Sequence, residues 1–92
     1  MTMPSAVARL GFRSATPADE QTVVRLNLLL ARSLGRMVDP AAVGRGVRAM
    51  LTDPALGTYV LATDGSEVLG QIQLAPLFDD WHDGIVWWAD GL

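Results

Sequence analysis

The most constraining feature of the sequence is a segment near its end whose apolar side chains point both ways. Both alternating sets of positions there are apolar, namely Ile85, Val86, Trp87, Trp88 and Ala89. A strand of this kind is typical of the interior of a sheet that is covered on both faces and has a neighbour at each edge. The chain stops at Leu92, before it supplies another strand. We therefore expect one uncovered edge, two uncovered indoles and the front part of a larger fold.

Two helices are predicted in the first half of the chain. Thr16 and Pro17 form a cap followed by proline at the first helical position. A helical period of apolar residues follows at Val23, Leu26, Leu30 and Leu34. Gly35 ends this helix in the manner of a C-terminal cap. Asp39 repeats the cap-then-proline signal and opens a second helix to about Leu51.

The pattern then changes to period 2, which predicts a β-hairpin. Residues 57–63 and 67–74 form its strands, and Asp64 with Gly65 forms a tight turn. On the second strand, one face carries Val68, Ile72 and Leu74, and the other carries Gln71 and Gln73. Residues 76–83 are predicted to form a loop rich in acidic and aromatic residues, before a last strand that begins near residue 84.

These elements predict one small α+β domain. With 92 residues there is room for a single domain, and a hydrophobic content of 50% argues against disorder. Residues 1–8 are interpreted as a loose leader and residues 9–92 as the domain, which begins with a short strand at 9–15. The resulting order is β-α-α-β-β-β.

Charge and composition exclude several classes of function. The net charge is −3, and the seven basic residues are scattered arginines in the first half, which argues against nucleic acid as a partner. Acidic residues gather in the second half, as a solvated surface or as an attraction for a cationic ligand. No cysteine is present, so thiolate catalysis and disulfides are excluded. Neither a secretory signal nor an apolar run of ~20 residues is present, so we expect a cytoplasmic location and no membrane partner.

Several segments, in this order, resemble the first half of the GNAT N-acetyltransferases. Residues 11–19 (GFRSATPAD) resemble the first strand and turn of that family, and residues 59–71 (YVLATDGSEVLGQ) resemble its second and third strands. Asp80 and Trp81, followed by residues 85–88 (IVWW), resemble a subgroup with paired tryptophans on the fourth strand. The resemblance implies a three-layer α/β GNAT-like fold and acetyl transfer from acetyl-CoA by direct attack of an amine.

The resemblance also implies a cofactor segment that this sequence lacks. In the family, acetyl-CoA docks on the end of the fourth strand and on a glycine-rich loop with a basic residue at the start of the next helix. No such loop follows here, so we expect a domain truncated after its fourth strand, with neither acetyl-CoA binding nor activity on its own. A homodimer through the terminal strand, or a complementing chain, would complete it. The alternative is a non-enzymatic, degenerate GNAT domain that serves as a dimerisation or interaction module.

Asp90 is the candidate general base, because the resemblance implies an acidic residue on the fourth strand that takes the proton from the amine. Gly91 follows it directly and leaves open a second interpretation, in which the pair forms a turn.

The candidate substrate-binding residues belong to the acidic and aromatic segment and the strand after it. They are Asp79, Asp80, Trp81, His82 and Trp87. The acids would attract a cationic amine, and the indoles would line an acceptor pocket or pack in the core. His82 is the only histidine, and its ordinary pKa suits a general base or a metal ligand as well as a solvated loop residue. We predict no metal site.

Overall fold

The computed structural model describes residues 10–79 and 84–91. The elements, in chain order, are β1 (Leu10–Ser14), η1 (Pro17–Asp19), α2 (Glu20–Ser33), α3 (Pro40–Thr52), η2 (Pro54–Leu56), β2 (Thr58–Asp64), β3 (Glu67–Asp79) and β4 (Gly84–Gly91). Apart from two short 3₁₀ turns, this is the predicted β-α-α-β-β-β order. The α+β fold class is therefore confirmed.

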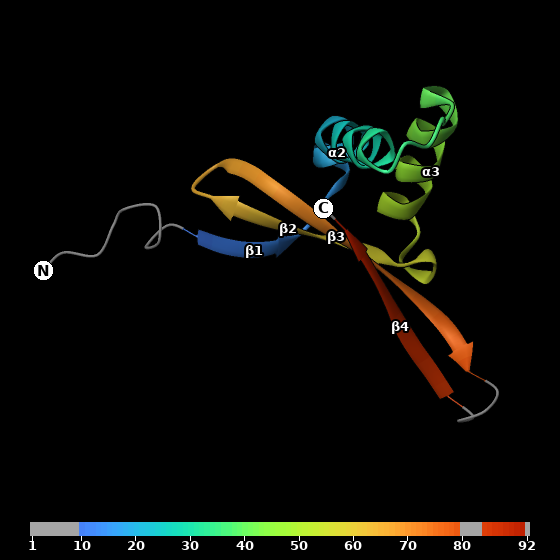
Figure 1. Cartoon of the computed structure of the whole chain (residues 1–92). Coiled ribbons are helices and arrows are strands. Elements are labelled where there is room, and N and C mark those ends of the chain that lie inside the picture. Colours follow the sequence, from blue (N-terminus) through green and yellow to red (C-terminus); the bar gives the residue numbers. More distant parts are fainter. Residues whose placement is uncertain (1–9, 80–83, 92) are drawn as a thin grey trace, which may run out of the picture.

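The strands form one antiparallel sheet in the order β1-β2-β3-β4. Helices α2 and α3 lie together on one side of it, as Figure 1 shows. Strand β2 pairs with both β1 and β3, so it is an interior strand, whereas β1 and β4 are the edges of the described sheet. Strand β4, which the sequence suggested as an interior strand, has β3 as its one neighbour within the described residues.

The helix boundaries follow their sequence signals closely. The Asp39 carboxylate accepts a hydrogen bond from the backbone N–H of Ala41, which caps α3. After α2, Gly35 adopts a φ of 68°, and the N–H of Arg36 donates to the carbonyl of Ala31 over 2.9 Å. This is the six-to-one hydrogen bond of a Schellman helix end, which needs the left-handed conformation that glycine allows.

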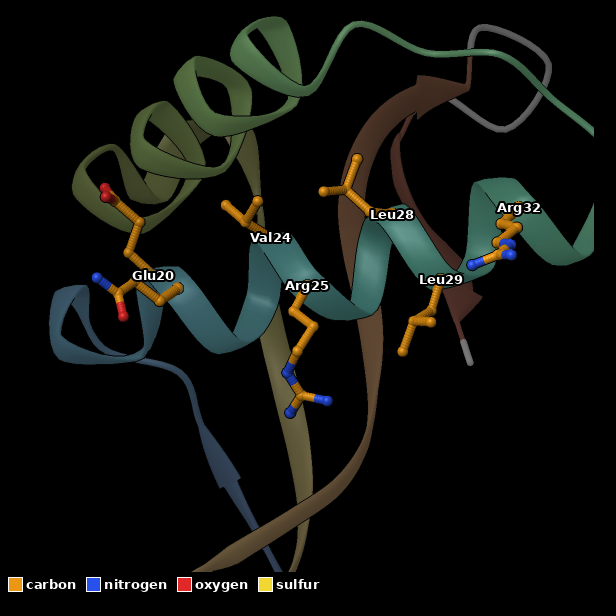
Figure 2. Close-up of a pocket in the computed structure, with 7 residues that line it drawn as sticks. Glu20, Val24, Arg25, Leu28, Leu29 and Arg32 are labelled. Carbon is orange, nitrogen blue, oxygen red and sulfur yellow. The ribbon is translucent and has the colours of Figure 1, made fainter.

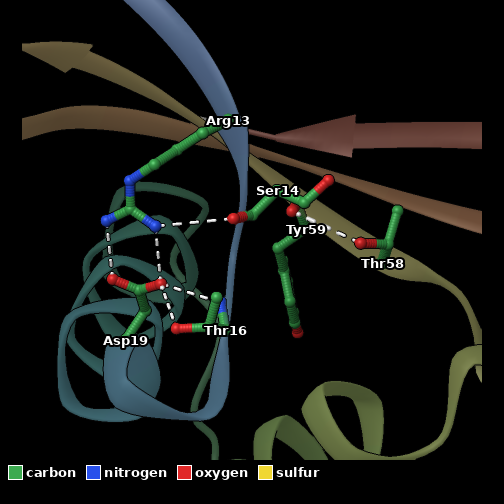
Figure 3. Close-up of polar contacts among 6 residues, drawn as sticks. All are labelled: Arg13, Ser14, Thr16, Asp19, Thr58 and Tyr59. Carbon is green, nitrogen blue, oxygen red and sulfur yellow. Dashed lines mark hydrogen bonds and ion pairs between the residues drawn. The ribbon is translucent and has the colours of Figure 1, made fainter.

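The junction between β1 and α2 is fastened by a bidentate ion pair. The two terminal guanidinium nitrogens of Arg13, Nη1 and Nη2, each donate to the Asp19 carboxylate over 2.8 Å, and the backbone N–H of Thr16 donates to the same carboxylate (Figure 3). The hydrogen bonds from Arg13 are the main reason why the pKa of Asp19 lies far below its usual range. The sequence signal at Thr16 therefore marks a turn that an ion pair holds, followed by a 3₁₀ turn and then α2.

The core lies between the helices and the middle of the sheet. Val23 of α2, Val47 of α3, and Tyr59 and Leu61 of β2 form one buried cluster. Leu61 is completely buried, which agrees with the predicted alternation along β2. The opposite face of the sheet is open in the described residues, where Phe12 is 77% exposed.

Two sequence predictions about β3 are wrong. The chain was expected to leave the sheet at residue 76, but β3 continues to Asp79 as a two-stranded ladder with β4. Pairing with β2 ends at Leu74, so beyond that point one edge of β3 is free within the described sheet. Pro76 is tolerated there because its missing N–H removes no necessary ladder bond. Figure 1 shows this β3–β4 extension running past β2, away from α2.

The second correction concerns the faces of β3. A bulge shifts the register between Ala62 and Thr63, so that Thr63 pairs with Val68 while Ala62 pairs with Gly70. The extra residue turns Val68 to the helix-covered side, where it packs against the core, while Ile72 stays on the open face. The simple period-2 alternation placed both on one face, because a bulge leaves no signal in that alternation.

The turn of the hairpin lies one residue later than predicted, at Gly65 and Ser66. Before β2, Gly57 has a φ of 130°, and a Cβ there would meet the carbonyl oxygen of Leu74. Glycine at position 57 therefore allows the backbone after η2 to lie close to Leu74 of β3. Within the described residues, no helix has the length and apolar character needed to cross a membrane.

We predict that Asp19→Asn lowers the free energy of unfolding at about pH 7 by about 1 kcal/mol, because it removes the ion pair with Arg13 but keeps an oxygen at the turn. The pKa of Asp19 is lowered by folding, so its contribution is fully present above the unfolded pKa of about 3.9 and is lost as the pH falls below it. The difference between wild type and variant should therefore shrink at about pH 3, as measured by urea unfolding. Glu67→Gln, at an exposed carboxylate of β3, is the control, and an equal difference at both pH values would contradict the prediction.

Candidate functional site

A pocket opens between the two helices and the middle strands of the sheet. It has a volume of about 240 Å³ and is lined by Asn27, Val43, Gly46, Val47, Met50, Tyr59 and Gln73. These residues come from α2, α3, β2 and β3, so the pocket exists only when both helices pack on the sheet. None of the lining side chains is charged.

Three of the lining residues carry hydrogen-bonding groups. The Asn27 amide nitrogen donates to the carbonyl of Val23 over 3.0 Å, which fixes the side chain against its own helix. Burial raises the pKa of the Tyr59 phenol, and the side-chain hydrogen bond with Asn27 opposes this shift only in part. The Tyr59 hydroxyl is therefore protonated at neutral pH and can donate as well as accept a hydrogen bond.

Two glutamines of β3 lie on the covered face of the sheet, and Gln73 is the one that lines the pocket. Gln73 pairs with Tyr59 and Gln71 pairs with Leu61, so both lie on the face of the sheet that the helices cover. Gln71 is only 3% exposed, and its Oε1 has no hydrogen-bond partner within the described part of the chain. An unpaired buried amide oxygen costs about 1–3 kcal/mol, so this position is unfavourable for stability alone.

Helix α3 covers the pocket and contributes a residue without a side chain, Gly46, to its wall. A Cβ at Gly46 would meet nothing within 4 Å, although Gly46 lines the pocket. Because a Cβ would have open space, the packing of α3 does not require glycine at this position. Glycine also costs about 1 kcal/mol relative to alanine inside a helix, so helix stability does not favour it either. Its absent side chain leaves the pocket open. Gly44, on the same helix, also has nothing within 4 Å of a Cβ and does not line the pocket.

The register of the sheet places one of the predicted residues opposite a residue of the pocket. Asp90 of β4 is the cross-strand partner of Gln73, which lines the pocket. Trp87 pairs with Pro76 and, by alternation, lies on the open face with Ile72, where it is 59% exposed. It therefore lies on the opposite face of the sheet from Tyr59.

The structure does not place the remaining predicted residues at the pocket. Asp79 is the last residue of β3, paired with Gly84, and not part of a loop as predicted. Asp80, Trp81 and His82 lie outside the described residues. In residues 10–79 and 84–91, no group of three or more histidine and acidic side chains could hold a metal ion.

A second hollow of about 410 Å³ follows a single helix, α2. Figure 2 shows Arg25, Leu29 and Arg32 directed away from α3, while Val24 and Leu28 lie closer to it. At one end, Glu20 accepts hydrogen bonds from Arg48 over 2.9 and 3.2 Å and so ties α2 to α3. This hollow is an uncovered apolar helix face with arginines at its margin, and its carboxylate, Glu20, is already paired with Arg48.

The residues that line the first pocket were not singled out from the sequence. The available signals were weak: Asn27 interrupts the apolar stripe of a predicted helix, and Gln71 and Gln73 alternate with apolar residues. Such glutamines are typical of a solvated strand face, and only the position of the helices shows that this face is covered.

The fold has two helices packed on one face of an antiparallel sheet, with its elements in the chain order β-α-α-β-β-β. This is the class of fold of the acetyltransferase structures compared below. The chain is similar to a "possible acetyltransferase" from Clostridium difficile 630, with 29% identity and a TM-score of 0.81 over 88% of this chain and 54% of that chain. It is also similar to an integron cassette protein from the mobile metagenome of Cole Harbour Salt Marsh, with 27% identity and a TM-score of 0.74 over 89% of this chain and 53% of that one. No protein-family model and no curated protein matches the chain.

A third structure, of a "probable acetyltransferase", shares the fold at 19% identity, with a TM-score of 0.71 over 84% of this chain and 51% of that chain. The chain thus spans about half the length of the solved structures that it matches. The suspected resemblance is confirmed: this chain has the fold of a GNAT-like acetyltransferase half.

Acetyl-CoA use is suggested by these neighbours, but the described residues do not fit the nucleotide part of that molecule. Pyrophosphate needs backbone N–H groups of a glycine-rich loop at a helix start, with a basic residue nearby. In residues 10–79 and 84–91, α2 begins after an acidic residue, Asp19, and α3 begins after another, Asp39. Carboxylates at both helix starts would repel phosphate.

We predict that the single tyrosine of the chain titrates above the ordinary value of 10.0, because burial disfavours the phenolate. Tyrosinate absorbance during an alkaline titration reports Tyr59 alone. A pKa raised by folding means that the associated stability is present below the unfolded pKa and is lost as the pH rises through the folded value. Asn27→Leu should raise the midpoint further, and unfolding in urea should return it to the ordinary value. A folded midpoint at or below 10.0 would be incompatible with the described burial.

Proposed function

We propose that this chain contributes the acceptor side of an N-acetyltransferase that moves an acetyl group from acetyl-CoA to an amine. The observation that supports this most strongly is the fold match at a TM-score of 0.81 and 29% identity with the Clostridium difficile structure. The pocket between α2, α3 and the sheet supports the assignment of the acceptor side, because both helices and two strands line it and its hydrogen-bonding groups are uncharged. A cytoplasmic location, where acetyl-CoA is available, belongs to this proposal.

In the proposed reaction, acetyl-CoA supplies the acetyl group as a thioester. The contribution of this chain is to hold the acceptor and to take a proton from its nitrogen. An uncharged part of the acceptor lies in the pocket, beside Tyr59 and Gln73, and its amine lies outside. Asp90, the cross-strand partner of Gln73, takes the proton from the amine as its nitrogen forms a bond to the acetyl carbon. The bond from that carbon to the thioester sulfur then breaks, and coenzyme A leaves as the thiolate, which takes up a proton and is released as the free thiol. The acidic residues Asp79 and Asp80, together with Trp81 and His82, belong to the proposal as outer contacts for a cationic acceptor. Trp87 lies on the other face of the sheet and belongs to the second candidate function below.

The test supplies this chain with the acetyl-CoA-binding part that the proposal requires, from the same or a complementing chain. Acetyl-CoA and a panel of primary amines are added, and release of the free thiol is measured. We expect thiol release that depends on both substrates. Asp90→Asn should lower kcat by about 100-fold or more with a small change in KM, because general-base catalysis contributes about 10²–10⁴-fold. Glu67→Gln, remote from the pocket, is the control for general damage. Unchanged kcat in Asp90→Asn would remove its assigned role, and no release with any amine would contradict the proposed transfer.

A second candidate function, a dimerisation or interaction module, is supported by the open face of the sheet. Ile85 and Trp87 of β4 are each 59% exposed, and β4 is an edge of the described sheet. Exposed apolar side chains next to a free strand edge favour pairing with another chain. A second copy could pair along β4 and cover these residues, and a complementing chain would use the same edge.

We predict for this candidate that size-exclusion chromatography with light scattering gives twice the 9.9 kDa mass of one chain. Trp87→Glu should shift the species to the mass of one chain, because a carboxylate at an apolar interface must be desolvated. Met37→Glu is the matched control, since Met37 is fully exposed in the connection between the helices. A clean monomer of the unchanged chain at high concentration would remove the module hypothesis.

A further inference from the structure

The pocket between α2 and α3 has a chemical character that limits what it can bind. Its apolar wall consists of Val43, Val47 and Met50, and its polar groups are one phenol and two amides. A charged group placed there would lose its hydration without gaining an opposite charge, which is strongly unfavourable. Glu20 and Arg48, which join the two helices, already pair with each other. The pocket therefore selects against charged groups.

The size of the pocket sets a second limit. Cavities that hold drug-sized ligands have volumes of about 300–1,000 Å³. This pocket, at about 240 Å³, falls below that range. It can therefore hold a part the size of an amino-acid side chain, while the rest of a larger molecule lies outside it.

The polar groups are in a state to receive a ligand. Gln73 lines the pocket, and its side-chain amide offers both a donor and an acceptor. The Tyr59 hydroxyl is protonated at neutral pH. Two residues before Gln73 on the same covered face, the Oε1 of Gln71 is buried and unpaired within the described residues. A bound carboxamide or hydroxyl would match these groups, because each carries both a donor and an acceptor.

We propose that this pocket is a recognition subsite for an uncharged, carboxamide- or hydroxyl-bearing group attached to a short apolar chain, with Gln73 and Tyr59 as its hydrogen-bonding residues. Its role as part of the acceptor rests on the proposed transfer function, whereas binding itself does not. The glycine at position 46 keeps the roof of the subsite open, and the amine of the acceptor would lie outside it, beside β4.

The test uses the ¹⁵N-labelled chain and isobutyramide, a neutral amide with a short apolar end, and follows backbone amide shifts by NMR. We expect saturable shifts at Gly46, Val47, Tyr59 and Gln73 with a dissociation constant in the millimolar range, as is usual for so small a ligand. Isobutyrate, which has the same shape and a negative charge, should bind at least about tenfold more weakly.

Paired glycine variants locate the binding. Gly46→Phe should fill the subsite and weaken isobutyramide at least about tenfold, whereas Gly44→Phe, on the same helix, should leave the affinity within about twofold. Gln73→Leu tests the amide without changing the helix and should cost about tenfold. Spectra of each variant without ligand show whether it is folded, and the Gln73 variant suffices if the phenylalanine variants are not.

The proposal is overturned by an absence of saturable shifts, by equal binding of isobutyrate, or by equal weakening in both glycine variants. The thiol-release assay distinguishes this from failure of the transfer function. If acetyl transfer occurs but isobutyramide does not bind, only the subsite proposal is wrong. If isobutyramide binds but no amine is acetylated, the acetyltransferase proposal is wrong and the pocket remains a ligand site.

Discussion

The structure depends on the packing of two helices against the Tyr59–Leu61 part of β2. Val23 and Val47 reach this strand from α2 and α3, and together with Tyr59 and Leu61 they form the buried cluster. Since β2 is the interior strand that pairs with both β1 and β3, this contact also fixes where the edges of the sheet lie relative to the helices. In so small a domain, with a thin margin of buried surface, few other contacts can replace it.

The same packing explains why a polar pocket exists beside an apolar core. The helices cover the face of β3 that carries Gln71 and Gln73, so Gln71 is buried and Gln73 is partly buried. Stability alone favours apolar residues at such positions, because unpaired buried amides are costly. Polar residues on a covered face next to a pocket are typical of binding sites. Gln73, which lines the pocket, is the residue of this kind on which the proposed subsite rests.

The two faces of the sheet therefore have different roles. The helix-covered face holds the core and the proposed acceptor groups, while the other face presents Phe12, Ile72 and Trp87 in exposed positions. The matched part of this chain spans about half of each matched structure, and the acetyl-transfer proposal assigns the binding of acetyl-CoA to residues other than those described. An open apolar face and a free edge at β4 are the surfaces through which such residues, or a second copy, would associate.

The sequence by itself determined the element order, both helices and the fold class, because caps such as Asp39, the stop at Gly35 and the change of period are local signals. It also pointed to the acetyltransferase resemblance. Only the tertiary structure decided that β3 continues through Pro76, since a free strand edge is a property of neighbours and not of the segment. The bulge that turns Val68 inward, and the enclosure of Gln73 with Asn27 and Tyr59, also depended on which strand faces which helix. Local patterns report periodicity, but long-range packing decides which side of that period is buried.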